Sequence, residues 1–341
     1  MQSQRPPLPR PRGPLSAHVI GAVSQRHLSA TDGPDVERIV HDPLTDEDLH
    51  TALHVLYALH YRGFAGVPDD REWDPNLIAR RQELEAVFEG GLREATTEAV
   101  DAALAEGDVV TGIRALIEAD DGPDVTRFVQ REATIEQVRD MLKQRSIYTL
   151  KESDPTSFVL PRVDGPVKVA LAELQYDEYG SGRPDRLHSH LFARAMEAAG
   201  LDSTYGRYID EATGTTLAVD NAMSMLGLHR RLRAASLGHL ATYEATSTMP
   251  CRRMAQGIER LGFDQAVGDY FDEHVEADAV HEEVALADIC GRLVEQEPEL
   301  HREALFGAAA CLHLDAVAGR ETLARWASMS ERINERLEVP A

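Results

Sequence analysis

The sequence has little cysteine, no long apolar run and few basic residues. Its three cysteines, Cys251, Cys290 and Cys311, stand far apart among 341 residues, and no CxxC pair occurs. This spacing argues against a disulfide framework or a zinc knuckle and favours free thiols in a reducing cytoplasm. No apolar run reaches the ~18 residues of a membrane-spanning helix, and the apolar stretch 15–23 is too broken for a signal peptide. We therefore expect a cytoplasmic protein without a membrane partner.

The shortage of positive charge excludes further classes of protein. The chain carries 35 Lys and Arg against 58 Asp and Glu, a net charge of −23. Nucleic-acid binders use basic side chains to displace counterions from phosphates, so we expect no nucleic-acid partner. In contrast, 43% of the residues are hydrophobic, which is enough for a sizeable core, and 14 are histidines. Histidines and carboxylates are the ligands of non-haem metals, so the question is whether some of them are organised.

Strand signals are also scarce. Alternating apolar runs joined by Asn-Gly or Asp-Gly turns do not occur, whereas apolar residues recur at helical spacing along most of the chain after residue 40. The sequence therefore predicts an all-α protein. The expected helices cover residues 44–61, 75–100, 102–119, 134–146, 166–179, 186–199, 215–226, 229–246, 250–261, 265–292, 297–318 and 322–337.

Composition divides the chain into three parts. Residues 1–40 begin with a proline-rich segment and are predicted to be a disordered tail. Residues 41–130 form an N-terminal helical region, interrupted at Gly90-Gly91 and without a chemical motif. The breaker Asp120–Pro123 lies before the third part, a larger helical domain over residues 131–341.

One expected helix carries a pattern suited to a metal. His274, Asp278 and His281 follow the spacing H-x3-D-x2-H. At about 100° per residue, the second and third positions lie about 40° and 20° to either side of the first, so all three side chains share one face. Two imidazoles and a carboxylate suit iron. The same helix is rich in other acidic residues, so an ordinary polar face is the alternative.

Further ligands would have to come from neighbouring helices. Glu178 ends one expected helix and His188 begins the next, and the segment YGSGRPD lies between them. On a continuous helix the two side chains would point about 80° apart, but the glycines and the proline allow both to face one point. Asp185 forms a DxxH pair with His188 and is a competing ligand. A loop followed by an N-terminal histidine cap is the alternative.

A fourth candidate carboxylate is Glu244, which lies late in an apolar helix. A carboxylate buried there needs a partner. Metal binding would provide one, and an ion pair with Arg252 or Arg253 would provide another.

Glu178, His188, Glu244 and the triplet His274, Asp278 and His281 resemble, in this order, the ligand set of haem-oxygenase-like di-iron oxidases and oxygenases, the iron-containing redox enzymes. The segment Leu174–Phe192, LQYDEYGSGRPDRLHSHLF, is similar to the first ligand segment of that family. The resemblance covers roughly residues 140–295. The long, interrupted spacing from Glu178 to His188 resembles the N-oxygenating members, which carry one more carboxylate upstream, where Glu152 stands.

This resemblance implies a haem-oxygenase-like helical bundle with an additional N-terminal helical region. It implies two ferrous ions held by Glu152, Glu178, His188, Glu244, His274, Asp278 and His281. O2 would be the co-substrate and electrons would come from an external donor. The expected reaction is N-oxygenation of a small-molecule amine, such as an amino acid or a derivative. The N-terminal region implies a homodimer, since such regions in N-oxygenating relatives tend to pack against another subunit.

Other functions stay open at this level. The same fold could hold a di-iron oxidase that desaturates or fragments an aliphatic or amino acid, or a cofactorless or haem-binding relative. A non-catalytic helical assembly protein is the alternative from another class. Glu47 and His50 form a lone ExxH, and a ferritin-like site needs two. His50, His54 and His60 are therefore expected in the core or an interface, and His190 points away from His188. Side chains near the site could include Tyr176, Tyr179, Tyr243 and Arg183.

Overall fold

The computed structural model describes residues 5–25 and 32–338, apart from the side chains of residues 276–280 and 330–338. Within these ranges every regular element is a helix, so the prediction of an all-α protein is confirmed. No helix in this part of the chain is long and apolar enough to span a membrane.

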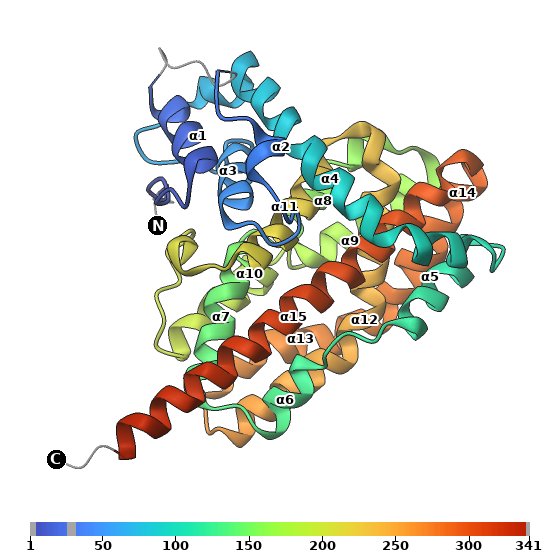
Figure 1. The fold of residues 1–341 in the computed structure, drawn as a ribbon. Coiled ribbons are helices and arrows are strands. Elements are labelled where there is room, and N and C mark those ends of the chain that lie inside the picture. Colours follow the sequence, from blue (N-terminus) through green and yellow to red (C-terminus); the bar gives the residue numbers. More distant parts are fainter. Residues whose placement is uncertain (1–4, 26–31, 339–341) are drawn as a thin grey trace.

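The first N-terminal helices, α1 (Pro14–Ser24), α2 (Val36–Ile39) and α3 (Glu47–Ala58), lie at one end of the molecule (Figure 1). Helix α4 (Pro75–Leu104) contacts all three and runs away from them, and α5 (Val109–Ala119) packs against α4 and the C-terminal helix. The apolar side chains of this region form one continuous hydrophobic cluster with those of the later helices α11 (Gly214–Leu228), α12 (Arg233–Arg260) and α15 (His301–Glu338). The N-terminal region is therefore part of the same core as the rest of the chain.

The expectation of a disordered tail is wrong for residues 14–24, which form α1. Pro14 stands at the first helical position, where its missing N–H has no partner to lose. The carboxylate of Asp48 accepts hydrogen bonds from the backbone N–H of Leu15 and Ser16, at 2.8 and 2.7 Å. Leu15 and Val19 are fully buried. Burial of the apolar face together with the Asp48 cap stabilises a helix in a segment whose composition favours extended chain.

The remaining helices form the main bundle. They are α6 (Val125–Arg131), α7 (Ile135–Thr149), α8 (Asp154–Ser157), α9 (Gly165–Glu178), α10 (His188–Ala198), α11 (Gly214–Leu228), α12 (Arg233–Arg260), α13 (Gln265–Glu283), α14 (Arg292–Gln296) and α15 (His301–Glu338). A π-helical segment, η6 (Val284–Gly291), joins α13 to α14. Single 3-10 turns are η1 (Asp69–Trp73), η2 (Leu160–Arg162), η3 (Pro184–Arg186), η4 (Ile209–Glu211), η5 (Arg230–Leu232) and η7 (Pro298–Leu300).

Several breaks expected from the sequence do not occur. Helix α4 continues through Gly90 and Gly91, α12 continues through Pro250, and α15 continues through Gly319. A glycine inside a helix costs only about 1 kcal/mol and a proline about 3 kcal/mol. Helices α4 and α12 bury several apolar side chains on both sides of the weak point, and α15 buries many before Gly319 and Trp326 after it. This burial outweighs the local cost.

Helices α12 and α15 pack unusually closely along the length of the bundle (Figure 1). A Cβ atom on Gly238 would lie 1.9 Å from the carbonyl oxygen of Ala304, and one on Gly307 would lie 1.8 Å from that of Ala235. Only glycine fits at these two crossing points. This contact fixes α12, which carries Glu244, against α15, which forms part of the cavity described below.

Candidate metal centre

Five segments bring acidic and histidine side chains together in the middle of the bundle. Glu152 follows α7, Glu178 ends α9, His188 begins α10, Glu244 lies in α12, and His274 and His281 lie on α13. They form two groups, each with ligand atoms within 4.8 Å of one another, and all six side chains are buried. The first group is Glu152, Glu178, His188 and His274, and the second is Glu178, Glu244 and His281.

Glu178 belongs to both groups and presents a different oxygen to each. Its Oε2 lies 3.1 Å from Nδ1 of His188, whereas its Oε1 lies 3.8 Å from Nδ1 of His281. Carboxylates can bridge two cations in this way, one oxygen toward each. The arrangement therefore suits two metal ions that share Glu178.

The loop between α9 and α10 re-aims His188 toward Glu178, as its glycines and proline predict. Gly180 has φ +80°, and a Cβ there would lie 2.4 Å from the carbonyl oxygen of Arg183. Ser181 also adopts a positive φ, of 53°. These conformations turn the chain tightly enough for two residues ten positions apart to face each other.

Two features position Glu152: a hydrogen bond from Tyr270 and the turn at the next residue, Ser153. The hydroxyl of Tyr270 donates a hydrogen bond to its Oε1, at 2.8 Å. The next residue, Ser153, has a φ of 69°, a backbone conformation that is strained for any residue other than glycine. The hydroxyl of Ser153 donates to Oε2 of Glu178, at 2.9 Å. One strained turn therefore positions both carboxylates of the first group.

The two histidines of α13 are oriented by acceptors outside the groups. Nδ1 of His274 lies 2.7 Å from the backbone oxygen of Tyr270, so Nε2 faces the first group. Nε2 of His281 lies 3.5 Å from Oδ2 of Asp177, so Nδ1 faces the second group. An acceptor on the outer nitrogen fixes the tautomer and the direction of a metal-binding imidazole. The sequence did not identify Asp177 as a site residue, because an acidic residue beside Glu178 follows no recognisable spacing.

Distances between the facing atoms fit metal coordination. Bonds of about 2.1 Å in an octahedral site place adjacent ligand atoms about 3.0 Å apart and opposite ones about 4.2 Å apart. Nδ1 of His281 lies 3.5 Å from Oε2 of Glu244. Glu152 Oε2, His188 Nδ1 and His281 Nδ1 are buried and form no well-aligned hydrogen bond with a described residue, although both nitrogens face carboxylates. Such orphaned polar atoms are costly unless a ligand satisfies them, and a divalent cation in each group would do so.

Electrostatics of the metal-free site follow from this crowding. Burial and then the charge of Glu178 raise the pKa of Glu152 to about 8. Burial would raise the pKa of Glu178, but the close approach and charge of His188 lower it to about 2. Burial would lower the pKa of His188 and of His281, but Glu178 and Glu244 respectively raise each to about 9. Without metal, protons therefore balance part of the negative charge.

The other residues singled out from the sequence lie elsewhere. The side chain of Asp278 is outside the described residues. Asp185 is exposed and pairs with Arg183 at 3.0 Å, so it is not in either group. Arg253, considered as a partner for Glu244, pairs instead with Asp124.

Most of the other histidines and tyrosines singled out from the sequence lie away from the two ligand groups. His50, His54 and His60 lie in the N-terminal region, and His54 contacts Asp220 at 3.2 Å. His190 is exposed, with Nδ1 3.1 Å from the backbone oxygen of Pro184. Of the four side chains considered near the site, only Tyr243 lines the cavity beside it, whereas Tyr176, Tyr179 and Arg183 are exposed.

Comparison with known families agrees with this geometry. The sequence model of the family described as iron-containing redox enzyme matches residues 139–316, which contain all seven expected ligands. The chain belongs to this family. It is also similar to a nitrosourea synthase from Streptomyces achromogenes subsp. streptozoticus, with 31% identity over 146 residues. That match covers 43% of this chain and only 31% of the relative's length.

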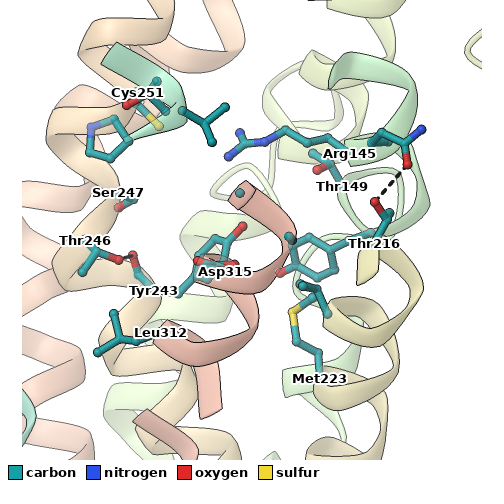
Figure 2. A pocket seen from close by; sticks show the side chains of 18 of the residues that line it. Arg145, Thr149, Thr216, Met223, Tyr243, Thr246, Ser247, Cys251, Leu312 and Asp315 are labelled. Carbon is teal, nitrogen blue, oxygen red and sulfur yellow. Dashed lines mark hydrogen bonds between the residues drawn. The ribbon is translucent and has the colours of Figure 1, made fainter. Parts of the chain in front are cut away.

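A large cavity adjoins the metal centre of this iron-containing redox enzyme. Its volume is about 520 Å³, and its wall includes Glu152, Glu178, Glu244 and His274. Figure 2 shows Arg145 and Thr216 on one side, Tyr243 and Cys251 on the other, and Asp315 of α15 between them. The volume is in the range of small-molecule sites. A substrate in this cavity would have one end against the two groups.

Proposed function

We propose that this iron-containing redox enzyme is a non-haem di-iron oxygenase that uses O2 to oxygenate the amine nitrogen of a small molecule. The supporting observation is the pair of buried ligand groups joined through Glu178, with Glu152 as an additional carboxylate in the first. The similarity to a nitrosourea synthase supports nitrogen as the site of oxygenation, because the nitroso group of a nitrosourea carries oxygen on nitrogen.

The protein's own contribution is to hold and orient. Glu178 belongs to both groups and would serve both ions, and Ser153 and Tyr270 keep Glu178 and Glu152 in place through their hydroxyl groups. Two ferrous ions bound there would supply O2 binding and electrons for its reduction. Conversion of an amine to a hydroxylamine inserts one oxygen atom into an N–H bond and reduces the other to water, which consumes two electrons and two protons. Those electrons come from an external donor.

Iron loading tests the centre. The full chain, loaded anaerobically with ferrous iron and desalted, is expected to retain about two ions, one for each group of ligands. Glu178→Ala should lose most of both, because its carboxylate serves both groups. Asp185→Ala is the matched control, since it removes an exposed carboxylate from the adjoining loop. Absence of iron in the unaltered protein, or full retention in Glu178→Ala, would refute the proposed centre and favour a non-catalytic helical protein.

Product analysis tests the reaction. The iron-loaded protein, O2, a chemical reductant and a panel of amines should give a product with oxygen bound to nitrogen. Isotopically labelled O2 would show the source of that atom. A product that has lost two hydrogens or a carbon fragment, with no oxygen on nitrogen, would contradict N-oxygenation and indicate an oxidase. Glu152→Ala should reduce N-oxygenation; unchanged iron content and unchanged product would remove the role proposed for Glu152.

A further inference from the structure

The cavity contains a cationic side chain that has no protein partner. Arg145, in α7, lines the cavity deep within the protein, and its guanidinium points into the open space (Figure 2). Among the described residues, no carboxylate lies within ion-pair distance of it and no group accepts a hydrogen bond from it. The other cavity arginines differ, because Arg253 pairs with Asp124 and Arg325 pairs with Asp140. Arg145 is half-buried, and a guanidinium that is partly removed from water without a partner is costly, so an anionic ligand would lower the cost.

An anionic side chain without a partner lines the same cavity. Asp315 comes from α15, and no described cation or hydrogen-bond donor lies within reach of its carboxylate. Asp315 is exposed, and it lines the cavity. Burial raises the pKa of Asp315 to about 6, and the nearby charge of Arg145 opposes that rise, so the carboxylate is mainly ionised at neutral pH.

We propose that Arg145 and Asp315 bind the head group of an α-amino acid, with the substrate carboxylate on Arg145 and the substrate ammonium on Asp315. A guanidinium matches a carboxylate through two parallel hydrogen bonds, and an aspartate matches an ammonium. The two side chains are close enough for their charges to interact but are not paired with each other. A zwitterion offers a charge complementary to each of the two side chains.

The proposed subsite determines which nitrogen of the substrate can react. The same cavity wall includes the candidate ligands Glu152, Glu178, Glu244 and His274, and the charge of Arg145 reaches Glu152. An ammonium held by Asp315 keeps its proton and has no free electron pair, so it is not the nitrogen that is oxygenated. The reacting nitrogen then belongs to the side chain, which extends from the subsite toward the metal centre. This step rests on the proposed function, whereas binding of the head group does not.

Calorimetric titration of the full chain, with and without ferrous iron under argon, tests the subsite. The probes are L-lysine, L-ornithine and L-arginine, compared with cadaverine, which lacks the carboxylate, and 6-aminohexanoate, which lacks the α-ammonium. Loss of a charge-assisted hydrogen bond weakens binding about tenfold to a hundredfold. Arg145→Gln should therefore weaken the best amino acid by that factor and leave cadaverine unchanged. Asp315→Asn should weaken the same amino acid and leave 6-aminohexanoate unchanged.

Matched variants distinguish this role from a structural one. Arg253→Gln alters a cavity arginine that already has a carboxylate partner, so amino-acid binding should persist. Arg145→Gln and Asp315→Asn should keep or raise the melting temperature, because each removes a cavity charge that has no protein partner. Equal weakening of all probes by either variant, or no binding of any of the three amino acids by the unaltered protein, would overturn the proposal. Iron uptake without amino-acid binding would support the di-iron centre and overturn the head-group subsite. Amino-acid binding without iron uptake would support the subsite and overturn the di-iron centre.

Discussion

Metal binding to this protein should release protons, and the number can be worked from the metal-free site. His188 and His281 have a pKa of about 9, and Glu152 has a pKa of about 8. At pH 7 these three groups together carry about three protons. Metal ligands must be deprotonated. Loading the site at pH 7 is therefore expected to release about three protons per chain from these groups.

The sign of the pH dependence follows directly. Metal competes with protons for the same atoms, so apparent affinity rises as pH increases through the pKa values of the metal-free ligands. Near pH 7 each proton released contributes about tenfold per pH unit, or about a thousandfold for the two ions together. At pH 9 the imidazoles are about half protonated and Glu152 is largely ionised, so release falls to about one proton.

Calorimetry of metal binding in buffers with different ionisation enthalpies measures this number directly. Glu152→Gln keeps an oxygen for the Tyr270 hydroxyl but carries no titrating proton, so release at pH 7 should fall by about one. Asp185→Asn, at an exposed carboxylate, should change nothing. Release near zero at pH 7, or release that does not decline by pH 9, would show that the imidazoles are already neutral and would refute the electrostatic reasoning.

Three further predictions concern stability of the metal-free chain, measured by urea unfolding. Gly238→Ala should cost about 3 kcal/mol or more, because its Cβ would lie 1.9 Å from a backbone oxygen. Gly90→Ala, where nothing lies within 4 Å of the added Cβ, should instead stabilise the protein by about 1 kcal/mol. Equal effects of the two substitutions would contradict the close helix crossing. Lys151→Met removes the ammonium that lies 2.5 Å from the buried carboxylate of Asp220 and leaves that carboxylate with His54, at 3.2 Å. The change should cost about 3–5 kcal/mol, most of which is recovered when Asp220 is also made apolar. Burial lowers the pKa of His50 from 6.5 to about 4, so the free energy of unfolding is highest above pH 6.5 and falls as the pH decreases toward 4. At pH 5 the loss is about 2 kcal/mol. A His50→Gln variant whose stability has the same pH profile would disprove this.

The sequence was sufficient for the helices and for the order of the candidate ligands, for a physical reason. Helical periodicity reports which face is buried, and the ligand types are few, so His274 and His281 could be placed on one stripe before any coordinates. Helix boundaries were less predictable. Gly90 and Pro250 disfavour helix locally, but the burial that compensates comes from residues distant in the chain, and no local window contains it.

Supporting residues were beyond sequence reasoning because their role depends on three-dimensional position. Asp177 orients His281 across 104 positions of the chain, and it was indistinguishable from any other acidic residue near a helix end. Ser153 acts through a positive φ that sequence gives no reason to expect of a serine. Arg145 and Asp315 lie on helices of ordinary pattern, and only the packing of α7 and α15 around one cavity brings them together.

Departures from local stability rules concentrate around this one cavity. Ser153 holds a strained conformation, Arg145 and Asp315 carry charges without partners, and a π-helical segment directly follows the helix of His274 and His281. Elsewhere, buried charges such as Lys151 are paired. Strain and unpaired charge persist only where the surrounding structure tolerates their cost, and they are characteristic of sites shaped for ligands. Because Arg145, Asp315 and the ligand Glu152 line the same cavity, metal ions and a zwitterionic substrate would satisfy neighbouring groups, and the two binding events should reinforce each other.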